Sequence, residues 1–184
     1  INAGSSTDIK GWGYLLKYDT SYGVLNSEFK IQNSELTEEE KTGFLKDCIG
    51  YLIINEKEIP MFSQKDPSLL PWRDLNVDVV IESTGRFLTA EKLQAHLTAG
   101  AKKVVLSAPA KPASPQGGGG DIATYVLSVN DKNYKGESLI NNASCTTNCI
   151  TPVAKIMVDN FGVEKAMMTT IHGYTSDQRL QDGG

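Results

Sequence analysis

The sequence is short of the residues that build metal sites and disulfide scaffolds. Its 184 residues include only three cysteines and two histidines, whereas a structural zinc site needs about four well-spaced Cys or His ligands. We therefore expect no metal site. The odd, sparse cysteine count also argues against a disulfide scaffold and favours a reducing compartment, which we take to be the cytoplasm.

The chain also lacks a strong charge of either sign and any long apolar run. Its net charge is −4 and its charged residues make up 22%, which argues against a nucleic-acid or membrane surface as the main partner. No apolar run approaches the roughly 20 residues that cross a bilayer. The first residues have no initiator Met, basic region or apolar stretch, and the last are polar, so we expect an internal fragment of a longer protein.

Hydrophobic patterning in the middle of the chain predicts an α/β fold with a parallel sheet. Residues 77–81 read Val-Asp-Val-Val-Ile, a compact β-branched run typical of a buried parallel strand. Thr89 opens a helix that Gly100 ends, and residues 103–107 form the next strand. Strand, helix and strand at this spacing indicate a βαβ unit. We also expect a helix that Asp8 or Thr7 caps and that reaches Tyr18, and a helix from Ser144 to Asn160. Further strands are expected at 29–31, 51–54, 124–129 and 163–171.

Several other segments receive ordinary structural interpretations. The acid-rich run at 37–41 is typical of a solvated helix start, and the glycine-rich stretch at 112–120 of a surface loop. His96 is expected on a helix surface because no nucleophile accompanies it. The large apolar side chains are expected in the core by ordinary burial habits; they are Trp12, Trp72, Phe161, Met167 and Met168.

The most informative segment is residues 141–149, which read Asn-Asn-Ala-Ser-Cys-Thr-Thr-Asn-Cys. A polar turn there delivers Cys145 to the first turn of the expected helix. Unpaired backbone N–H groups and the helix dipole at that point favour a thiolate over a thiol. A thiolate is the stronger nucleophile at neutral pH. On this segment alone, a buried structural cysteine beside a helix cap is an equal alternative.

His172 is the candidate partner of Cys145. It follows the strand expected at 163–171 and precedes Gly-Tyr-Thr, and strand ends that open into loops carry working groups in α/β enzymes. A histidine beside a cysteine takes its proton and later stabilises an oxyanion. A structural histidine with satisfied hydrogen bonds is the alternative.

Together these motifs resemble the glyceraldehyde-3-phosphate dehydrogenase family. Residues 144–149 match its active-site signature, and residues 169–175, Thr-Thr-Ile-His-Gly-Tyr-Thr, resemble its second catalytic stretch. Three further segments resemble segments of the family and follow in the same order along the chain, at 16–23, 82–87 and 107–111. The likeness covers most of the chain and is weak at 33–47 and 112–120.

The resemblance implies a partial Rossmann-type parallel sheet followed by the start of an α+β catalytic domain. Residues 1–144 would form an incomplete dinucleotide-binding domain, and residues 145–184 would begin the catalytic domain. The glycine fingerprint G-x-G-x-x-G does not occur in this chain. Since that loop and most of the catalytic domain would lie outside it, we expect this piece alone to be inactive.

The family's chemistry, carried over to matching residues, is the oxidation and phosphorylation of glyceraldehyde 3-phosphate to 1,3-bisphosphoglycerate in glycolysis. Cys145 would attack the aldehyde, and His172 would take the proton and hold the oxyanion. Hydride would pass to NAD or NADP, and inorganic phosphate would attack the resulting thioester. Ser144, Thr146 and Thr175 match positions that hold phosphate groups.

The resemblance also indicates four cofactor-binding residues. Thr84 and Ser107 follow strands that line the dinucleotide crevice of this fold. Lys65 falls where the family often carries a basic residue near the adenosine half. Ala3 stands where NAD-preferring members usually carry an aspartate for the ribose hydroxyls, so NADP is as open as NAD.

Three alternatives stay open at this stage. Erythrose-4-phosphate dehydrogenase shares the cysteine block, although Thr175 favours the glyceraldehyde enzyme. A thiol hydrolase or acyltransferase built on Cys145 and His172 would need no dinucleotide crevice, and a non-catalytic interaction fragment would need no reactive thiolate. For the full-length protein the resemblance implies a cytoplasmic homotetramer, without nucleic-acid or membrane partners.

Overall fold

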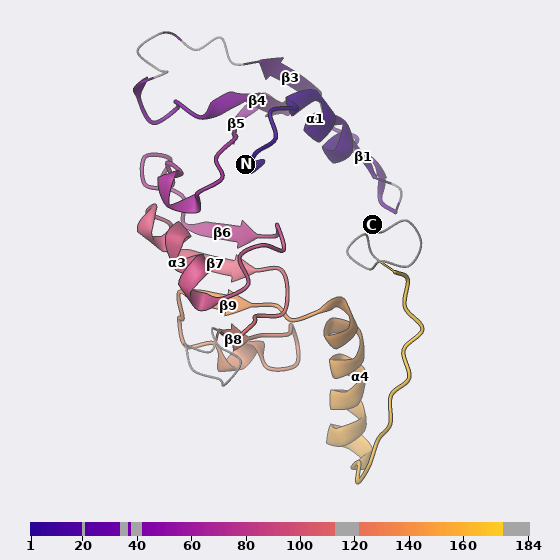
Figure 1. Ribbon diagram of the computed structural model, residues 1–184. Coiled ribbons are helices and arrows are strands. Elements are labelled where there is room, and N and C mark those ends of the chain that lie inside the picture. Colours follow the sequence, from indigo (N-terminus) through magenta and orange to yellow (C-terminus); the bar gives the residue numbers. More distant parts are fainter. Residues whose placement is uncertain (20, 34–36, 38–41, 113–121, 175–184) are drawn as a thin grey trace, which may run out of the picture.

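The computed structural model describes residues 1–19, 21–33, 37, 42–112 and 122–174. Thr175, most of the expected helix start near residue 38 and most of the glycine-rich loop lie outside the described residues. The architecture is mixed α/β, with an antiparallel sheet and a helix above a parallel sheet, and a final helix that projects from the lower sheet (Figure 1).

The N-terminal unit contains helix α1 (Ile9–Lys17) and two antiparallel sheets. Of the two expected caps, Asp8 is the one that caps α1, since its carboxylate accepts a hydrogen bond from the Gly11 N–H at 2.8 Å. The sheets are formed by β1 (Tyr18–Asp19) with β2 (Gly23–Val24), and by β3 (Phe29–Asn33), β4 (Cys48–Ile54) and β5 (Lys57–Phe62).

Strand β5 and its tight hairpin with β4 were not expected from the sequence. The turn is made by Asn55 and Glu56, whose φ angles are 48° and 65°. Positive φ at both central residues matches the right-handed twist of two paired strands. The Asn-Glu pair carries no glycine, so the usual sequence signal for such a hairpin is missing here.

The lower unit is a four-stranded sheet in the order β6-β7-β9-β8, and all its pairings are parallel. Its strands are β6 (Val79–Glu82), β7 (Lys103–Leu106), β8 (Ala123–Thr124) and β9 (Leu139–Asn141). Helix α3 (Ala90–Thr98) links β6 to β7, which confirms the expected βαβ unit and the α/β class. The core side chains Leu93, Val104 and Leu106 are 0% exposed.

The ends of α3 follow directly from the sequence. The Thr89 hydroxyl accepts a hydrogen bond from the Lys92 N–H and caps the first turn. At the other end Gly100 has a φ of +111°, and a Cβ there would lie 2.5 Å from the Cβ of Arg73. Only glycine can both adopt that backbone conformation and pass so close to Arg73.

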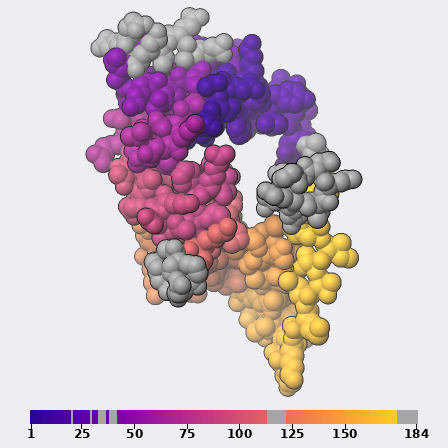
Figure 2. Space-filling model, viewed as in Figure 1, coloured from indigo at the N-terminus to yellow at the C-terminus, as the bar shows by residue number. Residues whose placement is uncertain are grey.

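Helix α4 (Cys145–Phe161) leaves the carboxyl edge of the parallel sheet, and residues 163–174 run back beside it. Figure 2 shows the two segments as a column that adjoins the rest of the molecule at its upper end and tapers away below it. The strand expected at 163–171 is wrong, because this segment is exposed and pairs with no strand of the described chain. An extended segment becomes a strand only when a neighbour completes its hydrogen bonds.

The strand expected at 124–129 is also wrong beyond its first residue. Strand β8 ends at Thr124, and a turn follows in which the Asn130 side chain accepts from the Val126 N–H at 2.8 Å. Ser128 has a φ of 64°, which no strand residue adopts. The polar residues of the turn outweigh the apolar run that suggested a longer strand.

Some expectations about burial are wrong as well. Trp72 is in the core at 7% exposure, but Trp12 and Phe161 are 42% and 74% exposed. Met167 and Met168 are also exposed. His96, expected on the surface, is buried at 4% exposure.

The strands of the parallel sheet end together at one edge. The Ser107 N–H donates to the carbonyl of Glu82 at 2.9 Å, and the Asn142 N–H to the carbonyl of Leu106 at 3.2 Å. The segments that follow β6, β7 and β9 therefore leave the same edge, where α/β proteins place their ligands. Within the described part of the chain, no helix has both the length and the apolar character that crossing a bilayer requires.

Candidate active site

A buried asparagine sets the turn that leads into the cysteine helix. Asn141 is 1% exposed, and its amide donates to the Ile122 carbonyl at 3.0 Å and to the Thr124 hydroxyl at 2.9 Å. Its side-chain oxygen, Oδ1, accepts from the Ala143 N–H at 2.9 Å. Ala143 adopts a left-handed φ of 64°, so the chain turns sharply out of the sheet at a point fixed by the hydrogen bonds of the Asn141 side chain.

Two polar side chains then start helix α4. The Ser144 hydroxyl accepts from the Thr147 N–H at 3.1 Å and forms a further bond with the Thr147 hydroxyl at 2.8 Å. Asn148 donates to the carbonyls of Asn142 at 2.6 Å and Ser144 at 2.9 Å. These bonds fix the first turn and place Cys145 at its first helical position, where helix N–H groups are unpaired.

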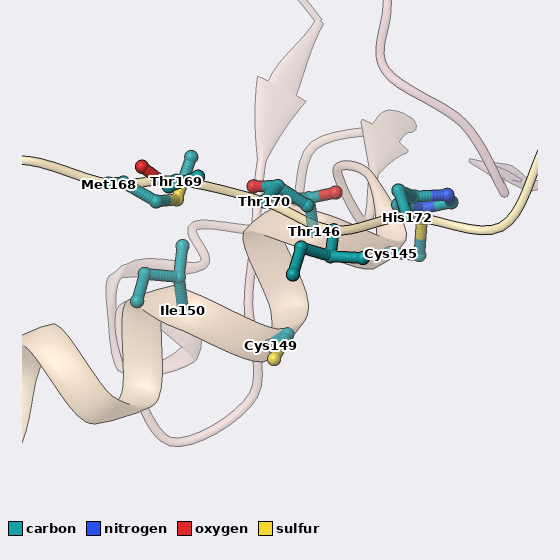
Figure 3. A pocket seen from close by; sticks show the side chains of 9 residues that line it. Cys145, Thr146, Cys149, Ile150, Met168, Thr169, Thr170 and His172 are labelled. Atoms are coloured by element: carbon teal, nitrogen blue, oxygen red, sulfur yellow. Dashed lines mark hydrogen bonds between the residues drawn. The ribbon is translucent and has the colours of Figure 1, made fainter.

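Cys145 and His172 meet at this helix start (Figure 3). The cysteine sulfur lies 3.2 Å from Nε2 of His172, and both residues are exposed. The other ring nitrogen, Nδ1, donates to the carbonyl of Gly173, because a carbonyl oxygen can only accept. Nε2 of the neutral ring is therefore free to accept the thiol proton.

The electrostatics of the pair favour a thiolate beside an imidazolium. The hydrogen bond with His172 lowers the pKa of Cys145 below its ordinary value, and the hydroxyl and N–H of Thr146 act in the same direction. The pKa of His172 is raised, first by Cys145 and then by the Gly173 carbonyl. Opposite shifts in adjacent acid and base groups are typical of an activated nucleophile.

The pair opens into a hollow of about 410 Å³ between α4 and residues 168–172. Figure 3 shows Thr146 beside the cysteine, with Met168 and Ile150 further along the hollow. Cys149 also lines it, one helical turn beyond Cys145. The hollow therefore offers a nucleophile, a base and a hydroxyl at one end and apolar walls at the other.

A second hollow of about 410 Å³ lies between the N-terminal unit and the parallel sheet. Ala3, Lys65 and Thr84, three of the four residues expected to bind a dinucleotide, line it. Ser107 is at the same sheet edge but does not line this hollow. The wall contains cationic, hydroxyl and amide groups together with the carboxylate of Glu82. The cationic, hydroxyl and amide groups suit the phosphates and sugars of a nucleotide.

The rim of this second hollow is held by reciprocal hydrogen bonds. Asn2 donates to the Gln64 carbonyl at 2.9 Å, and its own side-chain oxygen accepts from the Gln64 N–H at 3.0 Å. The Ala3 N–H donates to the carbonyl of Phe62 at 2.8 Å. The segment carrying Ala3 is thereby tied to the end of β5, next to Lys65.

Two buried polar residues in the wall of this hollow, Glu82 and His96, were not expected from the sequence. Both are almost fully buried, and their side chains bond to each other at 3.0 Å. A signal for His96 was present, because it follows the buried Leu93 by three positions and so lies on the inner face of α3. Nothing in the sequence pattern indicated that Glu82 would be its partner.

The other expected site residues have these positions. Ser144 is the helix cap, half-buried, and Thr146 lies against the cysteine sulfur. Thr175 lies outside the described residues. Among the residues that the structure describes, no three His, Cys, Asp or Glu side chains gather closely enough to hold a metal ion.

Comparison with known proteins shows the family. Residues 1–90 match the model of the glyceraldehyde 3-phosphate dehydrogenase NAD binding domain, and residues 144–184 match that of its C-terminal domain. Curated relatives named glyceraldehyde-3-phosphate dehydrogenase include those of Clostridium acetobutylicum, 44% identical over 96% of this chain, and Serratia marcescens, 40% identical over 96%. The cytosolic protein of Trypanosoma brucei brucei is 40% identical over 92%.

The chain spans about half the length of these relatives, 46%, 52% and 44% respectively. Ala3 and Thr84 of the second hollow lie in the first matched region, and Cys145 and His172 lie in the second. The paired thiol and imidazole, the parallel sheet and these matches agree, and the chain belongs to the glyceraldehyde-3-phosphate dehydrogenase family.

Proposed function

We propose that the protein oxidises and phosphorylates glyceraldehyde 3-phosphate to 1,3-bisphosphoglycerate, with NAD or NADP as hydride acceptor. The observation that carries the proposal is the 3.2 Å contact between the Cys145 sulfur and Nε2 of His172 at a capped helix start. The family matches favour this function over a thiol hydrolase, an acyltransferase or a non-catalytic module. Those alternatives need no dinucleotide-binding domain.

The reaction follows from the protonation states of the pair. The Cys145 thiolate adds to the aldehyde carbon, and the carbonyl oxygen becomes an oxyanion that the imidazolium of His172 stabilises by donating a hydrogen bond. When bound, the nicotinamide cofactor supplies the acceptor for the hydride that leaves this carbon. Loss of the hydride leaves the acyl group bound to Cys145 as a thioester. An oxygen of inorganic phosphate then attacks the carbonyl carbon, and the thiolate of Cys145 and the acyl phosphate are released.

Phosphate binding is assigned to Ser144, Thr146 and Thr175. The first two lie at the start of a helix of 17 residues, where N–H groups and the helix dipole favour anions. The Ser144 hydroxyl already caps the helix, so its role would be shared between the cap and an anion. Thr146 is the freer group, since it lines the hollow beside the sulfur.

The cofactor proposal has two versions, NAD and NADP. Ala3, Lys65 and Thr84 line one hollow, and an alanine at this point leaves no carboxylate to repel a 2′-phosphate while Lys65 supplies a cation. Comparing kcat/KM for the two cofactors in the whole protein separates the versions. An NAD preference of about a hundredfold or more would end the NADP version.

The organisation of the whole protein is part of the same proposal. Residues 1–144 would belong to the dinucleotide-binding domain and residues 145–184 to the catalytic domain, since the C-terminal family model begins at residue 144. A homotetramer in the cytoplasm is proposed by analogy with the family, one of whose members is named as cytosolic. Sedimentation analysis of the whole protein would test the tetramer.

The central experiment measures reduction of the dinucleotide by the whole protein with glyceraldehyde 3-phosphate. We expect activity that requires inorganic phosphate and disappears in Cys145→Ser. The matched control is Lys155→Gln, which removes an exposed ion pair with Asp159 on the same helix and should leave activity intact. Activity that persists without a thiol at 145, or a preference for erythrose 4-phosphate, would contradict the proposal.

A further inference from the structure

A chain of buried polar groups runs from the core to the wall of the second hollow. The indole N–H of Trp72 donates to Nδ1 of His96 at 3.1 Å, and Nε2 of His96 lies 3.0 Å from Oε2 of Glu82. The other carboxylate oxygen, Oε1, accepts from the N–H of Thr84 at 2.7 Å and from its hydroxyl at 2.5 Å. Trp72, His96 and Glu82 are 7%, 4% and 3% exposed.

The direction of each bond in this network follows from the donors available. An indole nitrogen can only donate, so Nδ1 of His96 carries no proton and the ring is neutral. Its single proton is on Nε2 and is donated to Glu82, which is therefore the acceptor. The hydrogen bonds make the tautomer of His96 unique.

Glu82 is the charged centre of the network. Burial by itself would raise the pKa of this carboxyl, but the hydrogen bonds from His96 and Thr84 outweigh it and hold the pKa below its ordinary value. The ionised carboxylate receives three hydrogen bonds, one on Oε2 and two on Oε1. A buried charge with so many donors holds them in a fixed geometry.

The consequence for Thr84 is specific. Its hydroxyl proton is directed to Glu82, and one of its lone pairs accepts the N–H of Arg86 at 3.2 Å. Gly85 lies between them with a φ of +72°, which closes the turn. The remaining lone pair makes the Thr84 hydroxyl an acceptor for any ligand in the hollow, and its donor capacity is already used.

We propose that Glu82 and His96 are positioning residues for the dinucleotide, because they hold the Thr84 hydroxyl as a pure acceptor at the crevice wall. The group it would bind is a hydrogen-bond donor of the nucleotide, such as a ribose hydroxyl or an amino group. A phosphate oxygen is disfavoured at that point, since it cannot donate and would face the Glu82 charge. This assignment rests on the proposed dinucleotide-dependent function.

A purely structural role for the network would make a different prediction. Loss of Glu82 would then lower the stability of the fold but leave the affinity for the dinucleotide unchanged. If Glu82 acts through Thr84, the two residues must instead be coupled, because removing the hydroxyl removes the means by which Glu82 affects the ligand. A double-mutant cycle separates the two roles.

The test measures the dissociation constant for NAD in the whole protein by calorimetry, well below the unfolding temperature. Glu82→Gln and Thr84→Val should each raise it about tenfold, and the double variant should be no weaker than Thr84→Val alone. Thr84→Ser, which keeps the hydroxyl, should bind within about twofold of the parent. The control Thr98→Ala changes an exposed hydroxyl bonded only within α3 and should leave binding unchanged.

The outcomes separate this inference from the proposed function. A parent protein that binds no dinucleotide overturns both. If the parent binds NAD normally but the effects of Glu82→Gln and Thr84→Val on the dissociation constant are additive, only the role of the network is overturned. The same holds if Thr84→Val leaves the dissociation constant unchanged. Should Glu82→Gln fail to fold, amide hydrogen exchange in the parent decides, since the Thr84 N–H must be protected by its bond to Glu82; rapid exchange would refute the assignment.

Discussion

Replacing His172 with glutamine should slow the alkylation of Cys145 by iodoacetamide about tenfold at neutral pH. The hydrogen bond with His172 is the main cause of the lowered pKa of the thiol. An ordinary thiol is only about a few per cent ionised at pH 7, so pairing can raise the thiolate fraction by about 30-fold at most. The expected tenfold loss lies within this limit, because Thr146 and the helix start still favour the thiolate in the variant.

The sign of the pH dependence gives a second test of the same reasoning. Since the pKa of Cys145 is lowered, the parent should keep its alkylation rate as the pH falls through the range where an ordinary thiol becomes protonated. The His172→Gln variant should lose its rate over that range. Above the ordinary thiol pKa both proteins carry a thiolate, so their rates should converge.

The assay follows the labelled residue by mass spectrometry, because Cys149 is also exposed whereas Cys48 is buried. Lys155→Gln, on the exposed side of the same helix, is the control and should react like the parent. A rate for His172→Gln within about twofold of the parent at pH 7, or two parallel pH profiles, would refute the pairing as the source of reactivity.

Three predictions concern stability and use the free energy of unfolding from urea titration. Leu93→Ala should cost about 2–5 kcal/mol, because this side chain is 0% exposed in the core; a loss below about 1 kcal/mol would mean that the core is loosely packed. Gly100→Ala should lower the free energy of unfolding by about 1–3 kcal/mol more than Gly162→Ala does. Both glycines have positive φ, but only a Cβ at residue 100 would clash with Arg73, at 2.5 Å. Equal losses for the two variants would show that no such clash occurs. Ser144→Ala should cost about 1 kcal/mol by loss of the helix cap, and an unchanged stability would mean that the cap contributes nothing.

Local signals in the sequence were strong where a few neighbouring residues decide the structure. Asp8, Thr89 and Ser144 were each expected to open a helix, and each side chain caps one in the structure. The β-branched run at 77–81 and the strand at 103–107 were expected to pair in parallel, and β6 and β7 do so. Caps and buried parallel strands depend on near neighbours, so the pattern alone suffices.

Expectations were wrong where a segment's structure depends on contacts with elements that are distant in the sequence. The apolar run at 163–171 has the composition of a strand, but pairs with no strand of the described chain. Phe161 has the large apolar side chain of a typical core residue but is 74% exposed. Side-chain type predicts a tendency to be covered, whereas actual burial requires a neighbouring element.

The sequence by itself determined the α/β class, the family likeness and the candidate nucleophile, because these rest on short motifs and local periodicity. Only the tertiary structure decided that Nε2 of His172 lies 3.2 Å from Cys145, residues 27 positions apart in the chain. It also brought His96 to Glu82 in the wall of the second hollow. The physical reason is that a proton transfer or a buried charge depends on distances of a few ångströms, which folding sets between residues far apart in sequence.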